Sequence, residues 1–365
     1  MRFFCLTASL LVVAGCGHTS GPDPAPAGPS AYVTTLGSFG SYAAPVVLSV
    51  SLNGVGSPTA ISLPSAPNSM RMDASGSSIY LGSGSGLLRI RTDNTKAETF
   101  VPSATGPVEA ISHNGRWVVA GDSLVDTTSQ TAKTVAPGIL QAAFSADDAT
   151  LYFVTLQGLY NYSMQTGQAQ PFPFSVAEVS GVLITGSGKY VAVIGNDWTV
   201  EVHASCDGSL VDSFSLPALA IAAVPSSDTL VSASPSSIGS VQLAANGTAC
   251  NAPVIHTMQS ASLPSAQTVL TNVRLAVTPN GKSAIMTGVP DPTGAFGAVV
   301  YDISGNRAQA VSLNGTTGTV GAAVTDDGKT AAVAGFDGLH TVDLATLQES
   351  SVIKLSIIPH LVVLK

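Results

Sequence analysis

The sequence predicts an all-β fold, and three observations lead to this prediction. Hydrophobic residues make up 45% of the 365 residues, whereas charged residues make up only 10%, far below the usual quarter. Gly (36) and Pro (22) are spread along the chain, as expected for many short strands joined by turns. Apolar and polar residues alternate between these turns, which is the periodicity of strands and not of helices.

One phrase recurs seven times. An apolar residue, three turn residues, and a Gly or Asp precede a β-rich run, as in "VTPNGKSAIMTG" and "VTDDGKTAAVAG". Such turns supply positive φ and predict a tight hairpin. In most copies a second alternating hairpin and a short fourth strand follow. The Gly or Asp of the copies, spaced by about 42 residues on average, is Gly76, Gly115, Asp148, Gly188, Asp228, Gly281 and Gly328.

Four antiparallel strands in each repeat of this length predict the blade of a β-propeller. The two ends of the chain predict how the ring closes. Residues 31–40, 45–54 and 58–63 have the pattern of second, third and fourth strands, and residues 360–364 supply the missing first strand. Pairing the two ends would remove a free sheet edge. We therefore expect eight four-stranded blades; the alternative is seven, with the N-terminal strands packed elsewhere.

These repeats resemble the YVTN/WD-like β-propeller repeats of secreted bacterial proteins over residues 31–365. The resemblance implies the architecture and says little about function. The Trp-Asp dipeptide and the Gly-His pair of WD repeats do not occur within residues 31–365, and "SHNGRW" only partly matches the Asp-box of sialidase-type propellers.

The N-terminus resembles a bacterial lipoprotein signal. Arg2 precedes an apolar run over residues 3–14, which is too short for a permanent membrane span. "VAGC" resembles the lipobox, which implies lipidation of Cys16. We expect a signal peptide at 1–15, a Pro/Gly-rich tether at 16–30 and a propeller domain at 31–365. The implied location is the bacterial cell envelope, at the outer membrane, either periplasmic or surface-exposed. An ordinary secretory signal, cut before Ser30, is the alternative.

Two cysteines remain in the exported body. Cys206 and Cys250 lie in turns after the third strands of adjacent blades, and an oxidising compartment would allow a disulfide between them. Neighbouring blades diverge near the rim, however, so both a bond and two free thiols stay open.

Catalytic signatures are missing from the sequence. The six His do not follow metal-ligand spacing, and neither C-x-x-C nor G-x-S-x-G occurs, so we predict no metal, no cofactor and no catalytic residue. The paired carboxylates at 145–149 and 325–329 are typical of turns whose Asp bonds its own backbone. The net charge of −8 without a basic run argues against a nucleic-acid partner. Only Arg274 interrupts the Ala/Val/Ser/Thr-rich strands expected at the channel.

Loops after second and fourth strands share one face with the channel mouth, where ligands are expected. The longest insertions predicted there are 256–272 and 288–297, with lesser ones at 38–45 and 171–181. Aromatic side chains could stack on a ligand, and Asp could accept hydrogen bonds from a sugar, peptide or cation. The candidate ligand-binding residues are Asp197, Trp198, Asp291, Phe296, Phe336 and Asp337; the alternative is that they only cap blade edges.

These observations favour a lipid-anchored envelope propeller that acts as a non-catalytic binding or scaffold module for a protein or glycan. One alternative is a propeller enzyme, similar to lactonases or quinone-dependent dehydrogenases, with its site at the channel mouth. Another is a subunit of an assembly such as an outer-membrane insertion machine.

Overall fold

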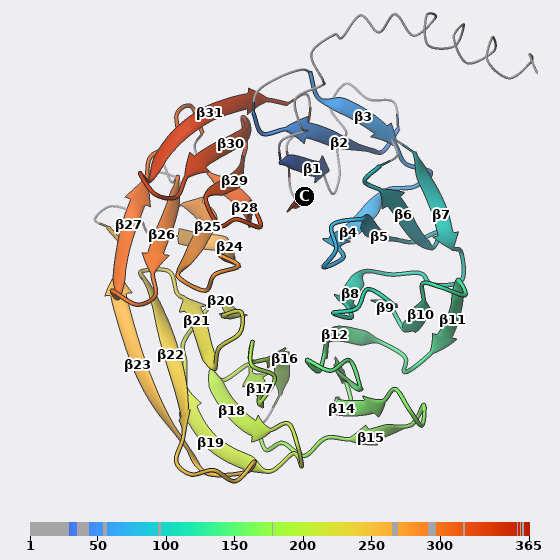
Figure 1. Ribbon diagram of the computed structural model, residues 1–365, viewed down its shortest axis with the longest axis vertical. Helices are drawn as coiled ribbons and strands as arrows, with labels where there is room; N and C mark the ends of the chain where they lie inside the picture. Colours follow the sequence, from blue (N-terminus) through green and yellow to red (C-terminus); the bar gives the residue numbers. More distant parts are fainter. Residues whose placement is uncertain are drawn as a thin grey trace, which may run out of the picture.

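The computed structural model describes residues 29–34, 44–53, 57–93, 96–176, 178–264, 269–290, 297–316, 318–355, 357, 359 and 361–365. Every regular element in these ranges is a β-strand, and the strands form eight four-stranded antiparallel sheets. Figure 1 shows the sheets arranged as blades around a central axis. Across these ranges we find no helical segment with the length and hydropathy of a membrane span.

The blades follow the chain, and each runs from the channel to the rim. Blade 1 comprises β4 (Pro67–Met72), β5 (Ser78–Ser83), β6 (Leu87–Arg91) and β7 (Ala97–Val101). Blade 2 comprises β8 (Val108–Ile111), β9 (Trp117–Ala120), β10 (Ser123–Asp126) and β11 (Thr131–Thr134). Blade 3 comprises β12 (Ile139–Phe144), β13 (Thr150–Thr155), β14 (Gly158–Ser163) and β15 (Ala169–Pro171). Blade 4 comprises β16 (Val179–Ile184), β17 (Tyr190–Gly195), β18 (Thr199–Ala204) and β19 (Leu210–Ser215).

The second half of the ring has the same organisation. Blade 5 comprises β20 (Ala220–Ala223), β21 (Thr229–Ala233), β22 (Ser237–Ala245) and β23 (Val254–Ser262). Blade 6 comprises β24 (Val269–Val277), β25 (Ser283–Pro290), β26 (Ala298–Asp302) and β27 (Arg307–Val311). Blade 7 comprises β28 (Thr319–Val324), β29 (Thr330–Gly335), β30 (Gly338–Asp343) and β31 (Gln348–Lys354). Blade 8 comprises β32 (Leu361–Leu364), β1 (Ser30–Thr34), β2 (Val46–Ser51) and β3 (Thr59–Ser62).

Blade 8 closes the ring with strands from both ends of the chain. β32 pairs antiparallel with β1, and the register runs from Ala31 opposite Leu364 to Thr34 opposite Leu361. Ser30 and Lys365 extend the ladder by exchanging two backbone hydrogen bonds of 3.1 and 2.9 Å. The predicted eight-bladed fold is therefore confirmed, and the seven-bladed alternative is wrong.

The hydrophobic core is divided among the spaces between blades. Eight clusters of buried side chains are present, and each joins two neighbouring blades. The cluster between blades 7 and 8 contains Ala31, Val33, Ala332 and Leu339, packed against Val362 and Leu364. Small side chains such as Ala332 let adjacent sheets approach closely, which preserves dense packing in a narrow wedge.

The recurring turns adopt positive φ as the repeat requires. The five repeat glycines have φ between 66 and 77°, and Asp148 has φ 56°. In the fifth copy, positive φ falls at Ser226 (55°) and not at Asp228. Asp228 instead hydrogen-bonds Ser187 of blade 4. The repeat alignment is thus displaced in this copy, where the turn itself is closed by Ser227 N–H donating to Val224 O.

The paired carboxylates of the turns have two different roles. Asp147 and Asp327 accept hydrogen bonds within their own turns, as predicted. Asp148 differs, because its carboxylate accepts the backbone N–H groups of His113 and Asn114 in the turn of blade 2, both at 2.9 Å. This carboxylate therefore fastens one blade to the next on the face opposite the mouth.

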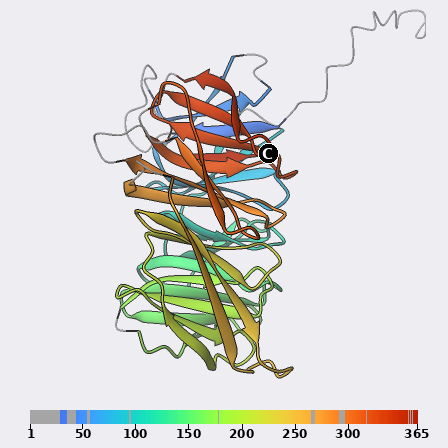
Figure 2. The same ribbon diagram turned by 90° about the vertical axis from the view of Figure 1, so that its left-hand side faces the viewer.

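The predicted insertion 256–272 is mostly strand, which corrects the sequence interpretation. Residues 256–262 belong to β23, and residues 269–272 belong to β24. β22 and β23 pair over nine positions, from Ser237 opposite Ser262 to Ala245 opposite Val254. Extra length in this repeat therefore lengthens a hairpin that runs along the rim toward blade 4 (Figures 1 and 2).

The long hairpin brings the two cysteines together. Cys206, in the turn after β18, forms a disulfide with Cys250, in the turn after β22, and their Cα atoms lie 6.5 Å apart. Nearby, Asn251 Nδ2 donates to Asp207 Oδ2 at 3.0 Å, and His256 Nδ1 lies 2.7 Å from Asp212 Oδ2. Of the two possibilities left open by the sequence, the structure shows the bond, because a hairpin with nine-residue strands spans the gap between the blades.

Removal of residues 361–365 should strongly destabilise the ring. Without β32, the hydrogen-bonding edge of β1 is open, and the apolar contacts of Val362 and Leu364 with blade 7 are lost. We expect a lower melting temperature and loss of a single cooperative transition, measured by circular dichroism. An unchanged melting curve would contradict the role of this closure.

Replacement of both Cys206 and Cys250 by Ser should destabilise the protein without changing the fold. The disulfide closes a 44-residue segment, and restricting the unfolded chain to this extent contributes about 3–4 kcal/mol. The measurement is the shift in urea midpoint, with dithiothreitol-treated wild type as the comparison. Equal midpoints for oxidised wild type and the double variant would show that the bond contributes no stability.

Candidate functional site

The sequence-predicted loop residues occupy one face but not one site. Asp197 and Trp198 connect β17 to β18 in blade 4, whereas Phe336 and Asp337 connect β29 to β30 in blade 7. Both connections follow second strands and therefore lie at the channel mouth, three blades apart. Asp291 and Phe296, like Cys16, lie outside the described residues.

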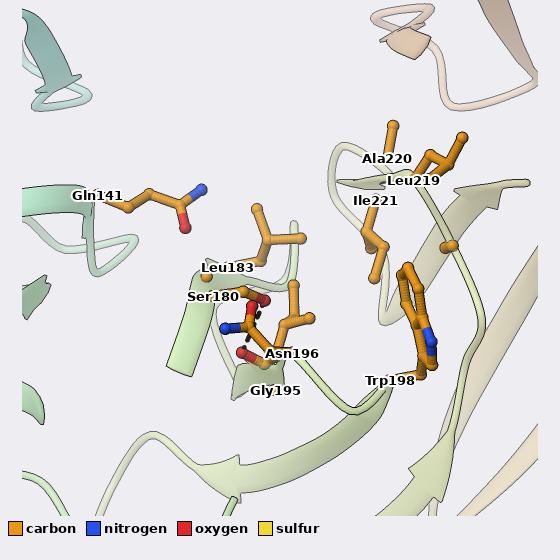
Figure 3. A pocket seen from close by; sticks show the side chains of 12 residues that line it. Gln141, Ser180, Leu183, Gly195, Asn196, Trp198, Leu219, Ala220 and Ile221 are labelled. Carbon is orange, nitrogen blue, oxygen red and sulfur yellow. Dashed lines mark hydrogen bonds between the residues drawn. The ribbon is translucent and has the colours of Figure 1, made fainter. Parts of the chain in front are cut away.

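A mouth pocket surrounds Trp198 where blades 3, 4 and 5 meet. Its volume is about 370 Å³, and its lining includes Gln141, Leu183, Asn196, Leu219 and Ile221. Figure 3 shows the Trp198 indole on one side of the pocket, with Gln141 on the other. The lining contains no charged residue. The pocket can therefore accept apolar groups and uncharged hydrogen-bonding groups.

Polar groups of this pocket keep hydrogen-bonding capacity for a ligand. Gln141 Oε1 accepts the Val182 N–H at 2.8 Å, but the amide nitrogen of Gln141 has no partner among the described residues. Asn196 Nδ2 donates to Glu178 Oε2 at 2.9 Å, which leaves Asn196 Oδ1 as an acceptor. Glycine at 181 leaves room for this arrangement, because a Cβ there would lie 2.7 Å from Gln141 Oε1 and would displace the amide.

Four of the eight large apolar side chains that are exposed among the described residues gather around the same sector. Leu140 is the second residue of β12, Leu156 lies between β13 and β14, and Leu219 lies between β19 and β20; they are 53%, 89% and 44% exposed. Trp198 is 43% exposed and has φ 69°, a conformation that is uncommon for a bulky residue. We call Leu140, Leu156, Trp198 and Leu219 the apolar arc. Phe336 is similarly exposed but belongs to blade 7, outside the arc.

A recurring β-bulge helps to build the mouth. The register between first and second strands shifts around Glu109, Leu140 and Ser180 in blades 2, 3 and 4. Each shift leaves one extra residue outside the regular ladder. These residues line a pocket or are exposed at the mouth, so simple alternation along the strand does not predict where they point.

Asp197 and Asp337 are engaged by their own blades. Asp197 accepts the Thr199 N–H at 3.1 Å and its hydroxyl at 3.0 Å. Asp337 accepts hydrogen bonds from Lys354 Nζ at 2.7 Å and His340 Nε2 at 2.8 Å. Burial would raise the pKa of Asp337, but the hydrogen bonds from Lys354 and His340 outweigh it and lower this pKa from 3.8 to about 2. Both carboxylates thus stabilise local structure.

Two buried histidines also belong to structural networks. His340 is fully buried between Asp337 and Glu349. His203 lies 3.0 Å from Gly208 O and 3.1 Å from Glu201 Oε2. Ser175 hydrogen-bonds Glu201 and not His203, so its hydroxyl is not placed for activation by the imidazole. Burial opposes ionisation of Glu201, but hydrogen bonds from Ser175 and His203 prevail and hold its pKa below its ordinary value.

A second pocket lies on the channel wall and contains charges that the sequence analysis missed. Its volume is about 330 Å³, and Arg71 on β4, Glu109 on β8 and His113 contribute to its lining. The expectation that only Arg274 interrupts the channel strands is therefore wrong. Arg71 in "MRM" and Glu109 in "VEA" interrupt apolar first strands in the same way. Both charges could therefore have been assigned to the channel from the sequence.

Arg71 and Glu109 influence each other without forming a close ion pair. Burial lowers the pKa of the Arg71 guanidinium and raises that of the Glu109 carboxyl, and each charge offsets part of the other's shift. Arg71 Nε donates to Val108 O at 2.9 Å. Among the described residues, the ion pairs within 4.0 Å do not include one between Arg71 and Glu109.

No group of three or more His, Cys, Asp or Glu side chains with a metal-binding arrangement occurs in the part of the chain that the structure describes. The groups that the two pockets offer are apolar side chains, uncharged hydrogen-bonding groups and, in the channel pocket, one guanidinium, one carboxyl and the imidazole of His113.

Neither a protein-family model nor a curated protein matches this sequence. Solved structures match the fold. The dihydro-heme d1 dehydrogenase NirN in complex with DHE matches with TM-score 0.66 and 14% identity, over 92% of this chain and 74% of that one. The β-propeller domain of Myceliophteria thermophila Cps50 (Swd1) matches with TM-score 0.57 and 10% identity, over 74% and 93%.

Kuenenia stuttgartiensis hydrazine synthase also matches, with TM-score 0.54 and 14% identity, over 76% of this chain and 96% of that one. These structural matches establish the β-propeller fold with WD40-like blades. At identities this low, they do not transfer an activity to this chain.

Asp337→Asn should lower the stability of the fold at neutral pH. It should also reduce the loss of stability that the wild type shows in acid. The folded pKa of Asp337 is about 2, below its ordinary 3.8, so its ionised form stabilises the fold above about pH 4. This contribution is lost as pH falls through about 2. Urea midpoints should differ most at pH 7 and converge near pH 2. A difference between the two urea midpoints that stays constant from pH 7 to pH 2 would contradict the lowered pKa of Asp337.

Proposed function

We propose that this chain is a lipid-anchored binding module of the bacterial envelope whose mouth, on blades 3 to 5, docks a polypeptide partner. The observation that carries the proposal is the apolar arc around the mouth pocket. Exposed apolar groups concentrated in one sector mark interaction surfaces, and an exposed Trp in a concave setting is a frequent energetic centre of a protein interface.

A polypeptide accounts for the arc better than a glycan. Three members, Leu140, Leu156 and Leu219, offer apolar area without hydrogen-bonding groups, and apolar side chains of a peptide would bury it. The amide nitrogen of Gln141 and Asn196 Oδ1 suit a peptide's carbonyl and N–H groups. A glycan would use Trp198 and these amides but would leave the leucines exposed.

The envelope location is supported by the N-terminal sequence. Arg2, the apolar run and Cys16 resemble a lipoprotein signal, and a Pro/Gly-rich segment follows as a tether. Labelling with a radioactive fatty acid tests this part: wild type should incorporate label, and Cys16→Ser should not.

The channel pocket favours one alternative, a propeller enzyme. Glu109, with its raised pKa, and Arg71 are groups that an acid–base reaction could use. NirN, a dehydrogenase by its description, shares the fold at 14% identity. Hydrolysis of lactones by wild type, lost in Glu109→Gln, would favour this alternative over a binding module.

Site-specific photocrosslinking in envelope-bound full-length protein tests the partner surface. A photoreactive residue at Leu156 or Leu219 should give a discrete adduct that protease digestion removes. Trp198→Ala should reduce this adduct by about tenfold or more, as expected for a central interface residue.

Leu210 is the matched control, because it is 53% exposed but lies on β19 at the rim. Equal adducts at Leu210, or none at either arc position, would contradict the proposed surface. An adduct resistant to protease but removed by glycosidase would replace the polypeptide with a glycan.

A further inference from the structure

We propose that the channel pocket binds a small carboxylate-bearing ligand, that Arg71 holds its carboxylate, and that protonation of Glu109 strengthens binding. This site is distinct from the apolar arc, although Gln141 and Leu183 contribute to both pockets. The inference therefore does not depend on the polypeptide partner.

Arg71 provides the cation. It is exposed to the channel on β4, while protein surrounds much of the side chain. Its Nε is engaged by Val108 O at 2.9 Å, which fixes the guanidinium against blade 2. The two terminal nitrogens have no hydrogen-bond partner among the described residues. A guanidinium held in this way can donate two parallel hydrogen bonds to a carboxylate.

Glu109 makes the affinity for a carboxylate depend on pH. It is half-buried on β8, at a bulge, and its carboxyl has no hydrogen bond to the described residues. Burial raises the pKa of this carboxyl, and Arg71 opposes the rise only partly. An ionised Glu109 would repel a bound carboxylate, whereas the protonated acid would donate a hydrogen bond to it.

The other groups facing this pair are few. Of the residues that line the pocket, only Arg71, Glu109 and His113 are titratable. His113 lies in the turn after β8 and is paired with Asp148 of blade 3 at 2.9 Å. The remaining lining from β12 and β16 is uncharged and includes Gln141, whose amide nitrogen can donate to a ligand. A carboxylate thus meets donors on two sides.

The dimensions and the setting favour a small anion. A space of about 330 Å³ lies at the lower end of the range for small-molecule pockets. The protein carries net charge −8, so its outer surface disfavours anions in general. A guanidinium on the channel wall is a local exception, and low-dielectric walls focus its field on the channel.

The direction of the pH effect follows from Glu109. As pH falls toward the raised pKa of Glu109, more of the carboxyl is neutral and repulsion of the ligand decreases. Binding of a carboxylate that stays ionised should therefore tighten between pH 7.5 and 5.5. Arg71 stays protonated over this range, so it does not contribute to the change.

Calorimetric titration of the purified full chain tests the proposal with matched probes. Galacturonate and lactate, which both stay ionised over this range, are the carboxylates; galactose and lactamide are their uncharged counterparts. Wild type should bind at least one carboxylate, more tightly at pH 5.5, and should bind its counterpart at least about tenfold more weakly. Arg71→Met should weaken carboxylate binding by about tenfold or more, and Arg71→Lys should retain part of it.

Glu109→Gln should bind the carboxylate more tightly than wild type does at pH 7.5 and should lose the pH dependence. Arg274→Met is the matched control, because Arg274 lies on β24 and does not line this pocket; it should bind like wild type. Circular dichroism verifies folding of each variant.

The proposal is overturned if neither carboxylate binds wild type, or if Arg71→Met and Arg274→Met bind equally well. Persistent pH dependence in Glu109→Gln overturns the role of Glu109 and points to His113. Trp198→Ala should bind the carboxylate normally, so failure of the partner surface and failure of this site give different results.

Discussion

The antiparallel pairing of β32 with β1 is the constraint on which the rest of the structure depends. Each blade buries its faces against two neighbours, and the eight apolar clusters are complete only when blade 8 receives strands from both ends of the chain. The four residue pairs of this ladder thereby complete the two apolar clusters on either side of blade 8. A channel with defined walls, and the sites on it, exist only as a result of this closure.

The architecture was predictable because its signals are local. Turn residues such as Gly281 and Gly328 mark each hairpin, and strand alternation marks the rest of each blade. The sequence left the Cys206–Cys250 bond open, since the bond depends on a hairpin with nine-residue strands that reaches a neighbouring blade. Sequence spacing showed the extra length of this repeat, but not whether it formed a loop or a longer ladder.

The candidate sites were only partly predictable for a related reason. Trp198 was identified from its loop and does line the mouth pocket. Leu140 was missed because a bulge removes it from the regular alternation of its strand, whereas Glu109 was overlooked although its charge interrupts an apolar strand in the sequence. Asp337 was assigned to ligand binding from its loop, but the lysine and histidine that engage it come from β31 and β30. Such partnerships follow from pairing across a sheet and are not visible in a short motif.

The direction of β1 determines the face on which the proposed membrane tether would join the ring. Ser30 pairs beside Lys365, at the end of β32 away from the mouth, and β1 runs from there toward Thr34 at the mouth. The preceding segment thus enters the propeller on the face opposite the apolar arc. With Cys16 inserted in lipid, the ring would be attached by its underside. The apolar arc would then lie on the face of the ring opposite the tether, where a partner in the aqueous phase could reach it.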